Sequence, residues 1–304
     1  MSDEQNDERT TSAPPADGGA APPAAPRADA ASHTAPPAAG ARGWLATRAR
    51  HLALAVTFLT AVRLPDAGAA VPATDLWASM AWYPLVGALL GLAAWALYAL
   101  LLYAVPPLLG AALVIVALEL VTRALHLDGL MDTADGYLSG APRERALEIM
   151  KDSRVGAMGV FAAVAVIVVK VSALAALARS DAALGLIAGL SAARLLPVLD
   201  VRYFAYARRE GTGAAFAGAG TTNGPVVAAV ATAVAVALVV GAVAWPGAVG
   251  AFLTVDVALA AIAVTLCVQA LVARRLGGLT GDVYGLGVEL AEAVALIGAV
   301  MIVR

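Results

Sequence analysis

The chain has 304 residues, of which 61% are hydrophobic and only 14% charged, and its mean hydropathy is +0.82. These values exclude a water-soluble globular domain of this size, because too few polar side chains are present to cover its surface. A net charge of −2 without a basic arm gives no electrostatic basis for binding nucleic acid, and the single cysteine, Cys267, excludes an intrachain disulfide or a cysteine-based zinc site.

The chain begins with a segment of different composition. Residues 1–42 consist mainly of Ala, Pro, Gly and acidic residues, which bury too little apolar surface to offset the entropy of ordering, so they are predicted to form a disordered tail. They also lack the continuous apolar core of a signal peptide. Residues 43–304 are expected to form a single membrane-embedded domain.

The first apolar segment, residues 44–64, mixes Arg48, Arg50, His51 and Arg63 with large apolar side chains. That mixture is typical of a helix that lies at the membrane surface or is only partly inserted. Pro65 is expected to end this helix, because proline cannot donate the next backbone hydrogen bond.

Apolar stretches fill the rest of the chain. They are unbroken runs of Ala, Leu and Val with few charges, whereas a membrane barrel would show alternating strands of roughly ten residues. Because backbone groups in lipid must bond internally, the runs predict an all-α polytopic membrane protein with six or seven transmembrane helices. The expected spans are 76–103, 107–122, 156–178, 182–199, 225–245, 250–273 and 285–303.

The connections between these spans alternate in charge. Those at 105–110 and 246–249 carry no charge, whereas those at 123–155, 200–224 and 274–284 are rich in Arg and Lys. Because basic residues accumulate in loops on the cytoplasmic side, the three basic connections are expected to face the cytoplasm.

The connection after the second span is the most polar part of the chain. In its first half Asp128, Asp132 and Asp135 have the spacing i, i+4, i+7, which places them on one face if the segment is helical. Three converging carboxylates repel one another unless a cation compensates, and oxygen ligands alone favour Mg²⁺. The alternative is a set of solvated loop charges, which Gly129 and Gly136 favour because glycine weakens a helix.

Basic residues follow the aspartates. The side chains of Arg143, Arg145, Lys151 and Arg154 can hold phosphate oxygens through charge-assisted hydrogen bonds. Together with a metal they indicate phosphoryl chemistry, in which His126 could act as a base. The alternatives are an exposed helix of mixed charge and a hydrogen-bonded structural histidine.

Two later connections offer further candidates. Arg208 lies among closely spaced glycines that would let backbone amides approach an anion, and Thr280 and Asp282 lie between glycines before the last span, where an ordinary turn is the alternative. Ionisable residues inside the spans need partners or a polar cavity, and structural ion pairing is the simpler interpretation. These residues are Glu119, Lys170, Arg194, Asp256, Glu289 and Glu292.

With these residues in view, the chain resembles the cobalamin-5'-phosphate synthase family. The stretches at 126–136 and 145–156 are similar to the signature of the family, and residues 58–65 and 278–285 resemble its N-terminal and C-terminal motifs. The resemblance covers roughly residues 50–304. Two positions differ: Ala61 and Val62 lengthen the first motif, and Tyr284 stands where a smaller residue is expected.

The resemblance implies transfer of the adenosylcobinamide-phosphoryl group from its GDP-activated form to α-ribazole or its 5'-phosphate, with release of GMP and a requirement for Mg²⁺. It also implies a bacterial inner-membrane location and association with other cobalamin-assembly enzymes. On this hypothesis the metal ligands are Asp128, Asp132 and Asp135, and the catalytic residues are His126, Asp152 and Asp282. The residues expected to bind substrate or phosphate are Arg63, Arg123, Arg143, Arg145, Lys151, Ser153, Arg154, Arg208 and Thr280.

Two other classes of membrane protein are alternatives to this one. A CDP-alcohol phosphatidyltransferase would also place aspartates around Mg²⁺ in a helical membrane enzyme, but Asp132 and Thr133 interrupt the motif expected for it. A secondary transporter would use intramembrane charges and often internal repeats, which the sequence lacks.

Overall fold

The computed structural model describes residues 41–64, 71–208, 213–217, 222–245 and 248–303. The predicted tail at 1–42 lies almost wholly outside the described residues. Within these residues the structure is helical, with one isolated parallel bridge between Tyr206 and Leu279 and no strand. The predicted all-α class is confirmed.

The helices follow one another through short connections. In chain order they are α1 (Ala41–Leu59), α2 (Ala73–Ser79), the 3₁₀ turn η1 (Met80–Trp82), α3 (Tyr83–Leu101), α4 (Pro107–Val121), α5 (Leu125–Leu138), α6 (Arg143–Ile149), α7 (Ala157–Ala175), the π-helical turn η2 (Leu184–Ala188), α8 (Gly189–Tyr203), α9 (Ala214–Ala217), α10 (Gly224–Ala244), α11 (Ala248–Leu276) and α12 (Gly281–Val303).

Six helical segments are long and apolar enough to cross a membrane, and α4 with α5 makes a seventh if this bent pair counts as one span. The two helices of the pair meet at 90°. The bend falls at Arg123 and Ala124, whose φ angles of 58° and 50° are left-handed, a conformation that non-glycine residues rarely adopt. The predicted span at 107–122 is therefore only the first arm of a broken helix.

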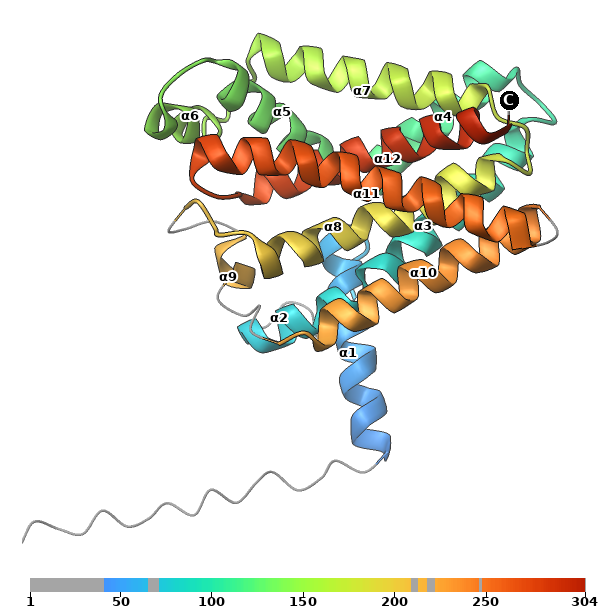
Figure 1. The fold of residues 1–304 in the computed structure, drawn as a ribbon, viewed down its shortest axis with the longest axis horizontal. Coiled ribbons are helices and arrows are strands. Elements are labelled where there is room, and N and C mark those ends of the chain that lie inside the picture. The colour runs from blue at the N-terminus through green and yellow to red at the C-terminus, as the bar shows by residue number, and fades with distance from the viewer. Residues whose placement is uncertain (1–40, 65–70, 209–212, 218–221, 246–247, 304) are drawn as a thin grey trace, which may run out of the picture. The chain divides into compact units, whose positions relative to one another are not determined.

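Helix α1 crosses the long helices at a steep angle in Figure 1. Its first half is exposed, whereas Leu54, Ala55 and Leu59 are buried against the bundle. This arrangement suits the predicted surface helix. The helix ends at Leu59, five residues before the predicted end at 64. The N–H of Thr60 still donates to the Val56 carbonyl at 3.0 Å, but that of Ala61 leaves the helical pattern and donates to the Val121 carbonyl at 2.7 Å.

The connections divide between the two ends of the bundle. Figure 1 places α6, α9 and the α11–α12 connection at one end, and the α3–α4 and α7–α8 connections at the other. The three connections predicted to share a side, which carry most of the loop Arg and Lys residues, therefore lie together.

Glycines set the closest helix contacts. A Cβ at Gly129 of α5 would lie 2.6 Å from the carbonyl oxygen of Asp282, and one at Gly285 of α12 would lie 2.8 Å from that of His126. Both are closer than real Cβ atoms approach, so only glycine lets these two backbones meet here. The contact fixes the acidic helix α5 on the first turns of α12.

A group of ionisable side chains joins the four helices α4, α7, α8 and α12. Lys170 of α7 lies 2.5 Å from Glu289 and 2.6 Å from Glu292 of α12, and 3.6 Å from Glu119 of α4. Arg194 of α8 pairs with the other oxygen of Glu292. Structural ion pairing is thus confirmed for these five residues. The sixth candidate, Asp256, is exposed on α11 and has no ion pair among the described residues.

Candidate active site

The acidic motif lies on helix α5, where a loop was the alternative. Its two glycines do not weaken the helix in this setting, because each faces a close neighbour. Gly129 meets the backbone of Asp282, and a Cβ at Gly136 would lie 2.8 Å from the carbonyl oxygen of Ala146 in α6. Tertiary packing of the glycine faces offsets their low helix propensity.

Three carboxylates gather where α5 meets α12. Asp128 stands in the first turn of α5, and Asp132 one turn later is close enough to Asp128 and Asp282, and to a smaller extent to Asp135, for like-charge repulsion. Asp282 stands in the first turn of α12. We refer to Asp128, Asp132 and Asp282 as the acidic group. Repulsion of this kind is relieved by a cation or by protons.

Asp135, the third aspartate of the motif, is directed elsewhere. One of its carboxylate oxygens accepts a hydrogen bond from the backbone N–H of Gly156 at 2.7 Å, and the other accepts one from the backbone N–H of Gly159 at 2.8 Å. These N–H groups belong to the start of α7, where a negative charge is favourable. The carboxylate therefore caps α7 and ties it to α5.

Asp282 has basic and hydroxyl partners. Nη1 of Arg208 lies 2.8 Å from its carboxylate, and the hydroxyl of the buried Thr280 lies 3.2 Å from the same oxygen, Oδ2. The other buried nitrogens of Arg208, Nε and Nη2, have no hydrogen-bond partner among the described residues. They are available to an anion beside the acidic group.

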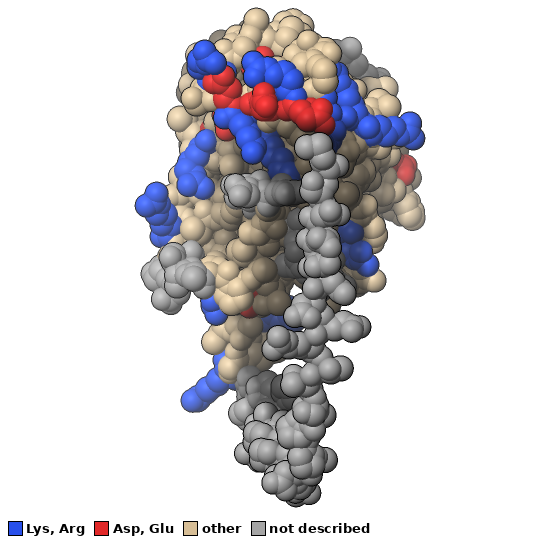
Figure 2. Space-filling view, turned by 90° about the vertical axis from the view of Figure 1, so that its left-hand side faces the viewer, with Lys and Arg blue, Asp and Glu red and all other residues tan. Residues whose placement is uncertain are grey.

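Figure 2 shows acidic and basic side chains close together on the end of the molecule that carries α6. Several of the basic residues predicted to bind phosphate are engaged there by protein groups. Arg143 donates to the carbonyls of Leu276 and Ala207, at 2.6 Å and 3.3 Å, and so fastens α6 to two other connections. Arg145 pairs with Glu148 at 2.9 Å on the exposed face of α6.

Arg154 and Asp152 form a pair of their own. The guanidinium contacts the carboxylate at 2.7 Å, and these hydrogen bonds lower the pKa of the exposed Asp152 carboxyl to about 2. The remaining predicted residues lie apart: Arg123 donates to the Phe58 carbonyl at 3.4 Å at the α4–α5 bend, and Arg63 and Ser153 are exposed.

A cavity of about 470 Å³ opens beside the acidic group. Its polar lining comes from His126, Asp128, Lys151, Arg208 and Asp282. The ring of His126 is buried, and its Nδ1 has no hydrogen-bond partner among the described residues. The structure therefore brings together five residues that the sequence placed in three separate connections.

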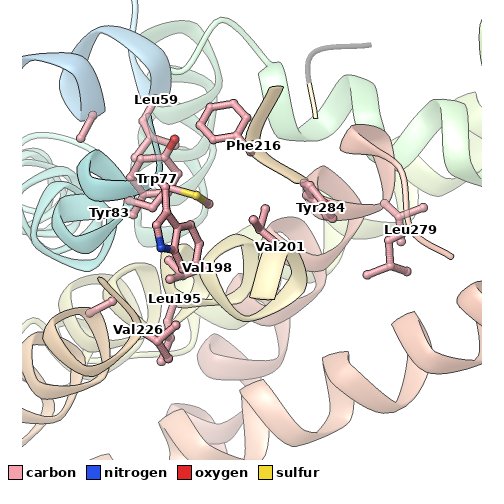
Figure 3. Packing of buried hydrophobic residues seen from close by; sticks show 14 of the residues in the cluster. Leu59, Trp77, Tyr83, Leu195, Val198, Val201, Phe216, Val226, Leu279 and Tyr284 are labelled. Atoms are coloured by element: carbon pink, nitrogen blue, oxygen red, sulfur yellow. The ribbon is translucent and has the colours of Figure 1, made fainter. Parts of the chain in front are cut away.

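The cavity also has an apolar lining that sequence reasoning missed. Leu59, Tyr83, Val201, Phe216 and Tyr284 come from five different helices and appear together in Figure 3. No periodicity links them, because each contributes one side chain from a separate segment. Tyr284, the position that differs from the expected motif, is a wall of this cavity.

The acidic group is the candidate site for Mg²⁺. Among the described residues no three Asp, Glu, His or Cys side chains are already placed to hold a metal ion. The donor set nevertheless consists of carboxylate oxygens beside a cavity, and Mg²⁺ is commonly held by one or two carboxylates with waters and substrate phosphates. The chemistry of the donors fits this ion.

Comparison with known proteins identifies the family. The family described as cobalamin-5-phosphate synthase matches residues 51–300. The adenosylcobinamide-GDP ribazoletransferase of Desulfitobacterium hafniense is 40% identical over 254 residues, covering 82% of this chain and 96% of that protein. The proteins of the same name from Alkalilimnicola ehrlichii (41%, covering 84% of this chain and 96% of that protein) and Pseudomonas fluorescens (37%, 81% and 96%) are also similar. No solved structure gives a significant match. The chain belongs to the cobalamin-5-phosphate synthase family.

Proposed function

We propose that this protein is a Mg²⁺-dependent adenosylcobinamide-GDP ribazoletransferase. It joins the cobinamide-phosphoryl group to α-ribazole or its 5'-phosphate, releases GMP and forms adenosylcobalamin or its 5'-phosphate. The family and the names of the relatives support the transferase activity. The observation that carries the Mg²⁺ requirement is the grouping of Asp128, Asp132 and Asp282 beside a cavity that Arg208 and Lys151 also line.

The reaction replaces one bond to phosphorus by another. A ribose hydroxyl oxygen of α-ribazole attacks the phosphorus that carries cobinamide, the bond to the bridging oxygen breaks, and GMP leaves with that oxygen. Asp128, Asp132 and Asp282 would hold Mg²⁺, which would neutralise charge on the pyrophosphate. Lys151, together with the Arg208 nitrogens that have no partner among the described residues, would bind phosphate oxygens of the same substrate.

We assign to His126 the role of accepting the proton of the attacking hydroxyl. Its ring lines the cavity beside Asp128, and its Nδ1 has no partner within the described residues. A neutral imidazole nitrogen of this kind is a suitable general base. Asp152, another predicted catalytic residue, is paired with Arg154 and does not line the cavity, so we assign it no step.

We further propose that the protein resides in the bacterial inner membrane with the acidic group toward the cytoplasm. The support is the concentration of Arg and Lys in the connections at this end of the bundle. The two alternatives, a CDP-alcohol phosphatidyltransferase and a secondary transporter, are not favoured, because the matching family is a different one.

The decisive experiment measures GMP release by the detergent-purified protein from adenosylcobinamide-GDP and α-ribazole 5'-phosphate, with and without Mg²⁺. Asp132→Asn is expected to lower turnover by roughly 100-fold or more, because a bound metal contributes several kcal/mol of charge stabilisation. Asp256→Asn, which changes an exposed carboxylate on α11, is the matched control and should leave turnover unchanged. Metal-independent release of GMP, or equal loss in both variants, would contradict the proposal.

A further inference from the structure

The apolar part of the cavity is separate in character from the acidic group. Phe58 and Leu59 of α1, Met80 of η1, Tyr83 of α3 and Phe216 of α9 line it, and none of them is charged. These residues come from three stretches of the chain: the end of α1, the continuous segment of η1 and α3, and α9. The whole cavity, including the part beside the acidic group, has a volume of about 470 Å³, within the range of roughly 300–1,000 Å³ that is typical of small-molecule sites.

Three aromatic rings form a wall of this part. Phe58 stacks on Tyr83 with ring centroids 6.0 Å apart and an interplanar angle of 13°, and Phe216 meets Phe58 edge-on at 5.2 Å. Rings arranged in this way present flat faces and edges to a planar guest. Base–aromatic stacking is a general means of binding a nucleobase that is not paired.

Tyr83 adds one polar group to this apolar wall. Its side chain is 1% exposed, yet its hydroxyl has no hydrogen-bond partner among the described residues. A buried tyrosine hydroxyl normally has a hydrogen-bond partner, because a buried donor without a hydrogen bond costs free energy. The Tyr83 hydroxyl, on the wall of the cavity, is therefore suited to a ligand that carries a hydrogen-bond acceptor.

The substrates of the proposed function differ in what this wall could accept. Guanine carries several donors and acceptors on its edge, which would lose hydrogen bonds to water without gaining replacements here. The corrin ring is large and bears amide groups around its rim. The dimethylbenzimidazole base of α-ribazole is planar, carries two methyl groups and, once joined to ribose, has a single ring nitrogen as acceptor.

Resting on the proposed function, we propose that the apolar part of the cavity binds the benzimidazole base of α-ribazole. Phe58, Tyr83 and Phe216 contact the ring, and the Tyr83 hydroxyl donates a hydrogen bond to its free nitrogen. The ribose then lies toward His126 and the acidic group, which line the same cavity. Selection of the acceptor base is thus carried by helices α1, α3 and α9, outside the acidic motif.

The kinetic test varies one substrate while the other is saturating. Tyr83→Phe is expected to raise KM for α-ribazole by about fivefold, the size of one lost hydrogen bond, and Phe216→Ala by roughly tenfold, the size of one lost stacking contact. KM for adenosylcobinamide-GDP should change by less than about twofold in both variants, because their side chains would not touch that substrate.

An analogue of the base tests the hydrogen bond of the Tyr83 hydroxyl separately. In the riboside of dimethylindole a C–H group replaces the free ring nitrogen, so it offers no acceptor to Tyr83. Wild type and Tyr83→Phe should use this analogue equally well, whereas they differ on α-ribazole. An equal penalty for Tyr83→Phe on both compounds would overturn the assigned hydrogen bond.

Two further measurements distinguish loss of the proposed contact from a general effect on folding or on catalysis. Tyr98→Phe removes another buried hydroxyl, which donates to the Leu174 carbonyl at 3.0 Å outside the cavity, and should leave both KM values unchanged. Direct binding of α-ribazole without turnover should weaken in Phe216→Ala. Unchanged binding of α-ribazole by Phe216→Ala would overturn the proposal. A rise confined to KM for adenosylcobinamide-GDP in the cavity variants would overturn it as well. Absence of Mg²⁺-dependent GMP release from the wild-type protein would instead count against the proposed function alone.

Discussion

Nη1 of Arg208 lies 2.8 Å from the carboxylate of Asp282, although the two residues come from different connections. The contact places next to three carboxylates a guanidinium whose Nε and Nη2 have no partner within the part of the chain that the structure describes. Opposite charges held side by side in this way are suited to a substrate that carries both a metal ion and phosphate oxygens.

Arg208→Ala is expected to raise KM for adenosylcobinamide-GDP by about tenfold and to lower kcat as well, because the pyrophosphate loses a charged donor and Asp282 loses its partner. Steady-state GMP release would measure both constants. Arg179→Ala is the control, since Arg179 packs over the Tyr103 ring at 4.0 Å at the other end of the bundle. Equal effects of the two substitutions would contradict a role for Arg208 in binding.

Asp282→Asn is expected to raise the Mg²⁺ concentration needed for half-maximal turnover by about tenfold or more, because one carboxylate ligand of the proposed site becomes neutral. A titration of turnover against Mg²⁺ checks this, after removal of metal with a chelator. Re-addition of Mg²⁺ to the chelated wild-type protein should restore activity. A half-maximal concentration equal to that of wild type would exclude Asp282 from the metal site.

Asp135→Ala tests the capping role against the metal role that the sequence suggested. Removing this cap should destabilise the protein by about 1 kcal/mol, because two N–H groups at the start of α7 lose their acceptor. Thermal unfolding in detergent measures the loss. The protein that remains folded should keep the Mg²⁺ dependence of wild type, and a changed Mg²⁺ requirement would return Asp135 to the metal ligands.

Lys170→Met should destabilise the protein by about 3–5 kcal/mol, because Glu289 and Glu292 would stay buried without their shared partner. Thermal unfolding and the yield of folded protein report this loss. Lys170→Met combined with Glu289→Gln should recover part of it, since one of the unpaired charges is then removed. A double variant no more stable than the single one would contradict the explanation.

The proposed orientation can be tested by labelling with a membrane-impermeant maleimide in a Cys267→Ser background. Ala104→Cys, at the end opposite the acidic group, should react in intact cells, whereas Ser153→Cys should react only after the membrane is opened. Both positions are exposed, so access is limited only by the membrane. The reverse pattern would place the acidic group outside the cell.

Much of the fold followed from local composition. The spans were predictable because lipid requires long apolar helices, and the alternation of basic connections gave their relative sides. The positions of Asp128 and Asp132 on one helix face followed from the helical repeat alone. The break between α4 and α5 was not predicted, since the left-handed residues Arg123 and Ala124 are not of a type that signals it.

The sequence by itself determined that the chain has several apolar spans and that its acidic segment lies with basic connections on one side. Only the tertiary structure decided which charges meet. The glycine contact between α5 and α12 brings Asp282 to the acidic group, the start of α7 draws Asp135 away from it, and α6 uses Arg143 to hold its neighbours. These outcomes depend on how closely helices distant in sequence pack, a property that side-chain periodicity does not encode.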